Sequence, residues 1–288
     1  MGSCYCEAMR LSQEKVFAFQ RIVWNYYRKH GRAFPWRKTR DPYAILVSEV
    51  MLQQTQAERV VPFFKKWMQQ FPTVQSLARA PLKKVLRAWS GLGYNRRALN
   101  LKRAAEKIVK EHGGKFPKTI PEIDALPGVG PYTAGAIAAF AFNTPSAFIE
   151  TNIRTVYLHF FFKNKREVRD DEILRMVQKT LPTPSLISPS KEGEKVRIRD
   201  WYNALMDYGG MLKKTKGNMN TRSAHYAKQS KFRGSRRELR GEILRKATRK
   251  ISVHPREFFL ESFPVAAIFS ELTREGFLKR KGSSFTLA

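Results

Sequence analysis

The feature that most constrains the fold is a glycine-containing turn that leads directly into an apolar helix, over residues 126–142. Gly128 and Gly130 permit backbone angles and close approaches that a Cβ would forbid. Pro131 suits the first position of a helix, where its missing N–H would have no partner. Free amides at such a helix start bind anions, and a phosphate is the natural occupant. We therefore predict that Gly128, Val129 and Gly130 hold a DNA backbone.

The charge of the chain favours the same partner. Lysine and arginine number 54 against 24 acidic residues, which gives a formal net charge of +30. Such a charge favours polyanions, because each neutralised phosphate releases counterions. A hydrophobic content of 42% supplies material for a core and argues against a disordered basic protein. No apolar run approaches the roughly 18 residues of a membrane span, and no signal-peptide pattern is present. We expect double-stranded DNA, and no membrane, as the partner.

The two cysteines, Cys4 and Cys6, both lie near the N-terminus. Two cysteines exclude a disulfide framework and fit a reducing cytosol. A Cys-x-Cys pair can bind metal, but inert thiols in a frayed tail are the commoner case, so we expect no metal site. The expected location is cytoplasmic, and nucleoid-associated if the source is bacterial.

Apolar residues recur at helical spacing along most of the chain, and no sustained alternation typical of strands occurs before residue 250. The predicted fold class is therefore all-α. The clearest predicted helices cover residues 60–71, 82–89 and 98–112, and a loop rich in proline and serine covers residues 181–193. Near the C-terminus, helices over 242–250 and 265–276 precede a two-stranded wing over 277–287. This order is typical of a winged-helix-like module.

Seven blocks, in the same order across residues 15–230, closely resemble adenine DNA glycosylases of the MutY family. They are Pro35-Trp36-Arg37, Asp41-Pro42-Tyr43, Ser48-Glu49-Val50-Met51-Leu52-Gln53-Gln54-Thr55-Gln56, Gly91-Leu92-Gly93-Tyr94, and the segments 126–135, 149–153 and 201–209. The resemblance implies a helix-hairpin-helix DNA glycosylase fold of two helical lobes, with DNA across their cleft. The expected domains are a disordered tail over 1–14, the glycosylase over 15–231, and the winged-helix-like module over 232–288.

Two carboxylates are the expected catalytic groups. Release of a purine needs a proton on the base and stabilisation of an oxocarbenium-like sugar, and two carboxyls in different environments can divide that work. Glu49 lies on a mostly apolar helix, where burial would raise its pKa and keep a proton available. Glu150 occupies the position at which the family has an aspartate, beside Asn152. Glutamate is one methylene longer, and errors of about 1 Å can cost on the order of a hundredfold in rate.

Tyr132 matches the position at which relatives of endonuclease III carry a Schiff-base lysine. Tyrosine cannot form that adduct, and no lysine lies between Lys118 and Lys163. We therefore predict a monofunctional glycosylase with little true lyase activity.

Family positions that handle the substrate are also present. An enzyme that acts on a base must extrude it from the duplex and fill the gap. By resemblance, Gln54 and Tyr94 wedge into the base stack, and Gln53 and Thr55 lie near the opposite base. Arg37 matches a position in the adenine pocket. A packed loop aromatic is the simpler interpretation of Tyr94.

The sequence departs from the family at the [4Fe–4S] cluster. The four cysteine positions align with Lys213, Asn220, Ser223 and approximately Gln229, and none of these residues is a thiolate ligand. We expect no cofactor, and a loop over 213–231 held by polar and packing contacts. The residues expected to make them are Asn218, Asn220, Arg222, Ser223, His225 and Tyr226.

The sequence therefore predicts a monomeric adenine glycosylase acting on adenine opposite guanine or 8-oxoguanine. A glycosylase for thymine or uracil opposite guanine is one alternative, although the Gln53-Gln54-Thr55 block favours adenine. A mismatch-binding protein whose Glu150 has lost catalysis is another. Only about fifty-five residues follow Phe232, where the family commonly has a larger domain that inspects 8-oxoguanine. The sequence therefore supports removal of adenine better than it supports a preference for 8-oxoguanine as the opposite base.

Overall fold

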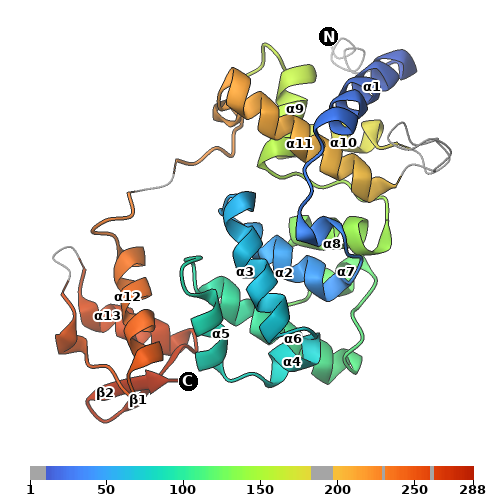
Figure 1. The fold of residues 1–288 in the computed structure, drawn as a ribbon. Coiled ribbons are helices and arrows are strands. Elements are labelled where there is room, and N and C mark those ends of the chain that lie inside the picture. Colours follow the sequence, from blue (N-terminus) through green and yellow to red (C-terminus); the bar gives the residue numbers. More distant parts are fainter. Residues whose placement is uncertain (1–10, 183–196, 229–230, 260–262) are drawn as a thin grey trace, which may run out of the picture. The chain divides into compact units, whose positions relative to one another are not determined.

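The computed structural model describes residues 11–182, 197–228, 231–259 and 263–288. These residues are mostly helical, as predicted, and the helices are labelled in Figure 1. The chain divides into two compact units, each built from two separate stretches. Unit 1 comprises Met1–Pro42 and Pro131–Ala227, and unit 2 comprises Tyr43–Gly130 and Lys228–Ala288. The predicted glycosylase domain is thus divided between the units, and the C-terminal module belongs to unit 2.

Unit 1 is built around two long helices, α1 and α11. Its elements are α1 (Gln13–His30), η2 (Pro35–Arg37), α8 (Pro131–Phe142), α9 (Thr151–Phe160), α10 (Asp170–Thr180), α11 (Ile198–Lys216) and η3 (Met219–Arg222). Helix α11 packs against both α1 and α9. The buried ring of Phe19 lies edge-on to Trp201 and to Tyr157, with centroids 5.7 Å and 5.6 Å away. Burial of such rings supplies most of the stability of a helical core.

Unit 2 combines six helices with the C-terminal module. Its elements are α2 (Pro42–Leu52, whose first residue belongs to unit 1), α3 (Ala57–Gln70), α4 (Val74–Arg79), α5 (Leu82–Trp89), α6 (Arg96–His112), α7 (Ile120–Asp124), α12 (Arg236–Arg249), η4 (Pro255–Glu257), α13 (Val265–Arg274), β1 (Leu278–Lys281) and β2 (Ser284–Leu287). Helix α6 packs against α4 and α5. Trp67, which is buried, places its ring 5.5 Å from Trp89 and 4.9 Å from Phe71.

The C-terminal module has the predicted order of helices followed by a two-stranded wing. Strands β1 and β2 pair antiparallel with Leu278 opposite Leu287. Phe269 and Phe277 are fully buried beneath the wing. Helix α12 begins at Arg236, six residues before the predicted start, because the Ser235 side chain accepts a hydrogen bond from the Glu238 amide and caps it.

The first helix also begins slightly earlier than predicted. Ser12 caps α1, so the helix starts at Gln13 and shortens the tail expected over 1–14. Residues 1–10, with both cysteines, and 183–196, with most of the predicted proline- and serine-rich loop, lie outside the described residues. Among the helices that are described, none is long and apolar enough to cross a membrane.

Candidate active site

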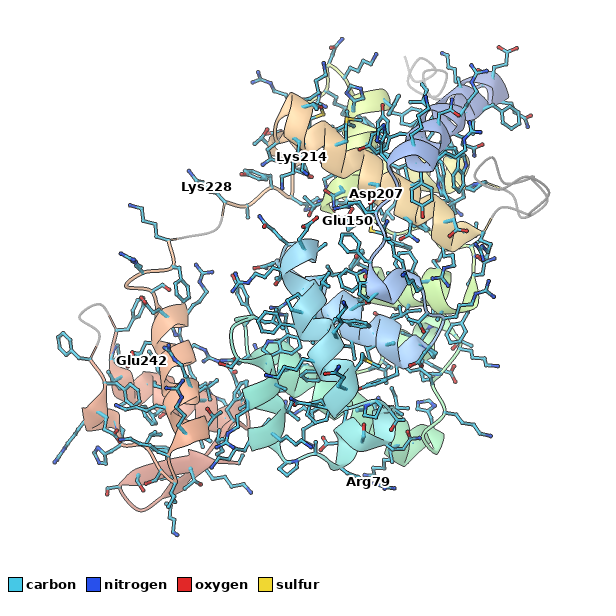
Figure 2. All side chains as sticks on the ribbon, viewed as in Figure 1. Arg79, Glu150, Asp207, Lys214, Lys228 and Glu242 are labelled. Carbon is cyan, nitrogen blue, oxygen red and sulfur yellow. The ribbon has the colours of Figure 1, made fainter. Side chains whose placement is uncertain are left out.

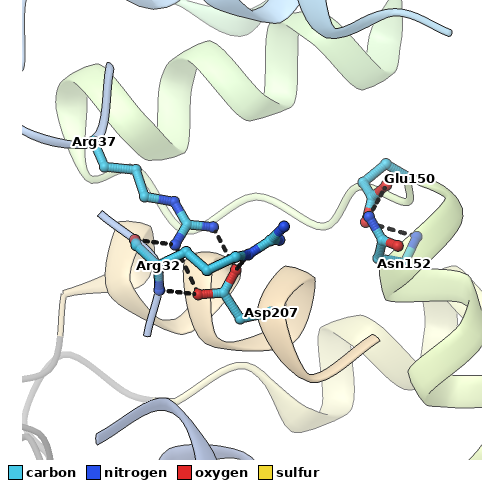
Figure 3. A network of polar contacts seen from close by, with 5 residues as sticks. All are labelled: Arg32, Arg37, Glu150, Asn152 and Asp207. Atoms are coloured by element: carbon cyan, nitrogen blue, oxygen red, sulfur yellow. Dashed lines mark hydrogen bonds and ion pairs between the residues drawn. The ribbon is translucent and has the colours of Figure 1, made fainter. Parts of the chain in front are cut away.

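Glu150 is the N-cap of α9, and its carboxylate closes the first turn of that helix. Its Oε1 accepts a hydrogen bond from the Asn152 backbone amide at 2.7 Å, and Oε2 accepts one from the Asn152 side-chain amide at 3.2 Å (Figure 3). Oε1 also accepts a hydrogen bond from the Ile153 backbone amide at 2.8 Å. A carboxylate suits this position because the first amides of a helix lack partners within it. The structure therefore brings together the predicted pair Glu150 and Asn152.

The environment of Glu150 favours the protonated carboxyl more than water does. Burial raises the pKa of Glu150, and the hydrogen bonds from Asn152 and Ile153 oppose that rise without cancelling it. The three donors are neutral amides. The charge of Arg154 also lowers this pKa, and its guanidinium forms a bidentate ion pair with Asp170, at 2.9 Å and 2.6 Å. Among the described residues, Glu150 is thus held in place without a direct ion pair.

A glycine sets the distance between α11 and the start of α9. A Cβ on Gly209 would lie only 2.2 Å from the carbonyl oxygen of Asn152 and 2.8 Å from its Cβ. The backbone of α11 therefore reaches Asn152 only because this position has no side chain. Gly209 ends one of the blocks that carry the family resemblance, and it acts on the Glu150 pair through Asn152.

Tyr132 lies in unit 1 on the first turn of α8 and is half-buried. Its ring packs edge-on against Phe148 at 5.7 Å, and Phe148 stacks on Tyr202 at 3.8 Å. Phe148 precedes Glu150 by two residues. This aromatic group therefore packs against the loop segment that leads to the Glu150 carboxylate. The structure gives Tyr132 a packing role beside Glu150.

Glu49 lies in unit 2 on α2, a helix whose residues Tyr43–Met51 are all buried. The side chain is only 6% exposed, which excludes the ordinary surface glutamate that a helix pattern alone allows. A carboxyl on a helix that is apolar on every face must be paired or protonated. The burial expected from the sequence is confirmed, and the acid role stays a prediction.

Arg37 belongs to a buried ion network in unit 1. Both of its terminal nitrogens donate to Asp207 at 2.8 Å, and Nη1 also donates to the carbonyl of Arg32 (Figure 3). Arg32 completes the network through its Nε, 2.7 Å from Asp207 Oδ1. The Arg37 side chain is only 10% exposed. This guanidinium joins the segment after α1 to α11, and its predicted place in an adenine pocket stays a prediction.

The two residues predicted to wedge into the base stack share an unusual backbone. Gln54 has φ of 55° and Tyr94 has φ of 48°, and only two other non-glycine residues of the described chain have positive φ. Left-handed backbone is costly for a residue with a side chain and clusters at functional sites. Both residues are exposed. Their loops therefore present two side chains outward at a cost in backbone energy.

Arg97 holds these two loops together, and the sequence reasoning missed it. Its Nη1 donates to the carbonyls of Val50, Met51 and Gln53 at 2.9, 3.0 and 2.6 Å. Its Nη2 reaches the carbonyls of Leu92 and Gly93 at 3.1 Å and 3.2 Å. Burial lowers the pKa of Arg97 to about 10, so the cation persists at neutral pH. The only sequence signal for this role was the position of the arginine, three residues after Tyr94.

The predicted phosphate-binding turn has the expected backbone. Gly128 has φ of +77°, and a Cβ there would lie 2.6 Å from the Cβ of Asn100 on α6. The Val129 amide donates to the Leu126 carbonyl at 3.1 Å, which closes the turn before Gly130. Of the predicted site residues, unit 1 holds Arg37, Tyr132, Glu150 and Asn152, and unit 2 holds Glu49, Gln53, Gln54, Thr55, Tyr94, Gly128, Val129 and Gly130.

Polar contacts hold the segment over residues 218–226, where the family has its cluster. The Asn220 side chain donates to the Thr155 hydroxyl at 2.9 Å, and Arg222 Nη2 donates to the Leu158 carbonyl at 2.7 Å. The Ser223 hydroxyl accepts from the His225 amide at 3.2 Å. Val168 pairs with this segment as an isolated bridge to Ser223. Asn220 and Ser223 are thus buried hydrogen-bonding residues, which do not fit an iron–sulfur cluster.

Lys213 and Gln229 are the other two positions that align with the cluster cysteines. Lys213 is exposed on α11, and Gln229 lies outside the described residues. Within the described ranges, no group of three histidine, cysteine, aspartate or glutamate side chains is arranged to hold a metal ion.

A family model described as HhH-GPD superfamily base excision DNA repair protein matches residues 47–182. The adenine DNA glycosylase of Buchnera aphidicola subsp. Baizongia pistaciae is 35% identical over 198 residues, covering 68% of this chain and 53% of that protein. The human adenine DNA glycosylase is 36% identical over 209 residues, covering 69% of this chain and 36% of the human protein. The chain therefore spans about half, or less, of the length of these curated relatives.

The fold is also similar to that of solved structures. A thermostable thymine-DNA glycosylase matches with a TM-score of 0.59 at 24% identity, covering 74% of this chain and 97% of that chain. At that identity the likeness establishes the fold alone, and it agrees with the helical glycosylase fold expected from the sequence.

Proposed function

We propose that this protein is a monofunctional adenine DNA glycosylase, because residues 47–182 match the family model of HhH-GPD superfamily base excision DNA repair proteins. Its substrate is adenine opposite guanine or 8-oxoguanine in double-stranded DNA. The observation that carries the proposal is the Glu150 carboxylate, fixed by the α9 amides and Asn152 without a direct ion pair. Such a group is suited to stabilise a sugar cation, because its charge remains available.

The proposed reaction divides the work between two carboxyls. The Glu49 carboxyl transfers its proton to the adenine ring, and the C1′–N bond breaks with its electron pair going to the base. The Glu150 carboxylate stabilises the cationic sugar, and a water adds to C1′ as its proton leaves to the Glu49 carboxylate. Tyr132 takes the position of a Schiff-base lysine, so the abasic strand stays intact.

The proposal includes the remaining expectations from the sequence. Gln54 and Tyr94 fill the gap left by the extruded base, with Gln53 and Thr55 near the opposite base. Arg37 lines the adenine pocket, and the turn over Gly128, Val129 and Gly130 binds a phosphate. The enzyme acts as a monomer in the cytoplasm, and at the nucleoid if the source is bacterial.

The test is single-turnover cleavage of short duplexes with adenine opposite 8-oxoguanine or guanine, and with thymine or uracil opposite guanine. We expect breaks only in the adenine strands and only after alkali. Release of thymine or uracil alone would identify the other glycosylase, and breaks without alkali would contradict the monofunctional mechanism.

The Glu150→Gln variant tests the residue that carries the proposal. We expect a loss of base release of about a thousandfold with duplex binding retained, since general acid–base and electrostatic groups contribute factors of this order. Glu14→Gln, an exposed glutamate in the first turn of α1, is the control and keeps the parent rate. Equal rates for both variants would exclude Glu150 from the chemistry. Duplex binding without base release by the parent itself would leave a mismatch-binding protein as the alternative.

The enzyme is further proposed to work without an iron–sulfur cluster. The hydrogen bonds of Asn220, Arg222 and Ser223 take over the positioning of this segment. Purified protein that releases adenine while holding neither iron nor acid-labile sulfide would support this. Stoichiometric iron in active protein would overturn it.

A further inference from the structure

A groove of about 1170 Å³ opens within unit 2, between α12 of the C-terminal module and the loop that precedes α6. Its walls come from two stretches that are far apart in the sequence. Residues 54–59 and 86–96 form one side, and residues of the C-terminal module form the other. Gln54 and Tyr94, the two non-glycine residues with positive φ in the described part of unit 2, both line it. The module therefore reaches the loops to which we assign the wedge.

Several hydrogen bonds fix the module in this place. Arg87 on α5 donates twice to the carbonyl of Thr248, at 3.1 Å and 2.8 Å, near the C-terminal end of α12. Arg103 on α6 donates to the carbonyl of Glu275, just after α13, at 2.7 Å. Both contacts place a cation at a helix C-terminus, where the last carbonyls lack partners in the helix. The groove is thus a built feature of unit 2 with walls that are tied together.

The groove is basic. Six arginines line it, Arg59, Arg96, Arg236, Arg237, Arg240 and Arg245, against the three glutamates Glu238, Glu271 and Glu275, which leaves a net charge of +3. Two of the glutamates are satisfied within the module: Arg240 bridges Glu271 at 3.1 Å and Glu275 at 2.7 Å. Arg236 and Arg245 are exposed, and Arg236 also pairs with Glu271. Groove-lining cations therefore face solvent, where they suit a phosphate chain.

Arg237 joins the module directly to the wedge loop. Its Nη1 donates to the Tyr94 hydroxyl at 2.6 Å, and its guanidinium carbon lies 5.7 Å from the centre of the Tyr94 ring. Arg97 approaches the same ring at 5.7 Å. The ring thus lies between a buried arginine that shapes its loop and an arginine of the module. A DNA strand in contact with Tyr94 would therefore lie close to the arginines of α12.

We propose that this groove binds the sugar-phosphate backbone of duplex DNA next to the extruded base, so that the C-terminal module is part of the substrate-binding surface. The inference rests on the proposed function, because it uses the assignment of Gln54 and Tyr94 as the wedge. Arginine matches phosphate geometry with paired donors, and such contacts position a duplex without reading its sequence. The module therefore contributes phosphate contacts next to the site of base extrusion.

The experiment compares two double variants that each remove two positive charges. Arg236→Gln with Arg245→Gln alters the groove, and Arg233→Gln with Arg249→Gln alters exposed arginines that do not line it. Arg249, like Glu242 in Figure 2, lies on α12, so the control samples the same module. Binding to a duplex with adenine opposite 8-oxoguanine, and to the matched duplex, is measured from low to moderate salt.

We expect the groove variant to bind both duplexes about tenfold more weakly at low salt. Its slope of log affinity against log salt should fall by roughly one to two, since each lost phosphate contact removes about 0.9 from that slope. The control variant should keep the parent slope. Circular dichroism and thermal melting confirm that both variants are folded. Parent-like slopes for both, or equal losses for both, would overturn the proposal.

Base release at saturating protein separates this proposal from the proposed function. If no duplex loses a base but the groove variant still changes the salt slope, the adenine assignment fails and the DNA groove stands. If adenine is released normally and the slopes of the two variants coincide, the groove assignment alone fails.

Discussion

Unit 1 contains two shielded carboxylates, Glu150 and Asp207, that are held in opposite ways (Figure 3). Within the described ranges, Glu150 accepts hydrogen bonds only from amides, and burial raises its pKa. Asp207 is also pushed toward a higher pKa by burial, but the hydrogen bonds and charge of Arg37 and then Arg32 outweigh it and lower its pKa. Asp207 is buried and Glu150 is half-buried, and the two groups differ in their hydrogen-bond and ion-pair partners.

This difference separates a structural carboxylate from the one that we propose to be reactive. An aspartate matched by two guanidiniums has its charge cancelled, and it serves to fasten the chain after α1 to α11. A glutamate fixed by neutral amides keeps an uncancelled charge at a defined position, which is what a developing sugar cation needs. The predictions below test this division, beginning with the largest expected effect.

Asp207→Asn should destabilise the fold by about 3–5 kcal/mol, because it leaves two arginines around a buried neutral group. Glu150→Gln should stay within about 1 kcal/mol of the parent, since it removes a charge that burial disfavours and keeps an oxygen to cap α9. Denaturant midpoints at neutral pH measure both. If Glu150→Gln were the more destabilising change, the division between the two carboxylates would be wrong.

The pH dependence sharpens the same contrast. The pKa of Asp207 is lowered when folded, so its contribution is complete above its ordinary value of 3.8 and is lost as pH falls below that value. The pKa of Glu150 is raised, so its charge costs stability at neutral pH, and that cost disappears as pH falls toward 4.5. On acidification, the parent should therefore gain stability relative to Glu150→Gln before it loses its advantage over Asp207→Asn.

Arg97→Lys extends the contrast to unit 2, where a buried cation is matched by carbonyls instead of carboxylates. Lysine cannot span the carbonyls of both loops, so we expect a loss of about 2–3 kcal/mol in stability. Base release should fall on the order of tenfold to a hundredfold as Gln54 and Tyr94 lose their placement. The control is Arg79→Lys, an exposed arginine on α4 (Figure 2). Equal behaviour of the two variants would remove Arg97 as a positioning residue.

Gly209→Ala tests how closely the Glu150 site depends on its neighbouring helix. The new Cβ would collide with the Asn152 carbonyl, and we expect a cost of about 1–3 kcal/mol together with slower base release at unchanged duplex affinity. Gly210→Ala is the matched control, because its Cβ would meet only the far end of Arg32, at 3.8 Å. It should be neutral or slightly stabilising, since alanine favours helix. Slower base release from the control variant would contradict the role of the contact with Asn152.

Gln54→Gly should have the smallest effect on stability, with the opposite sign to its effect on activity. Glycine relieves the left-handed backbone and should stabilise by up to about 1 kcal/mol, while base release falls because the wedge side chain is lost. Gln53→Gly, at a position without positive φ, should instead lose about 0.5–1 kcal/mol. A parent-like rate in Gln54→Gly would contradict the wedge assignment.

The helical fold and the backbone of the glycine-containing turn could be predicted from the sequence because their signals are local. A glycine-built turn and a helical repeat each act within a few residues, so the turn and helix start over residues 126–135 were predictable without a structure. The family blocks then attached roles to Glu49, Glu150 and Tyr132. The start of α12 was misplaced because its apolar pattern is weak in a strongly basic helix.

Only the tertiary structure showed what holds these residues in place. Arg97 donates to carbonyls more than 40 positions away, and Asp207 meets Arg37 across 170 positions. Nothing in composition or spacing pairs an arginine with a particular carbonyl or carboxylate, because such partners are chosen by packing of helices. The groove beside Tyr94 likewise exists only where the C-terminal module folds against α5 and α6. Local sequence thus determined which groups are candidates for the chemistry, and long-range packing decided how they are positioned and what lies beside them.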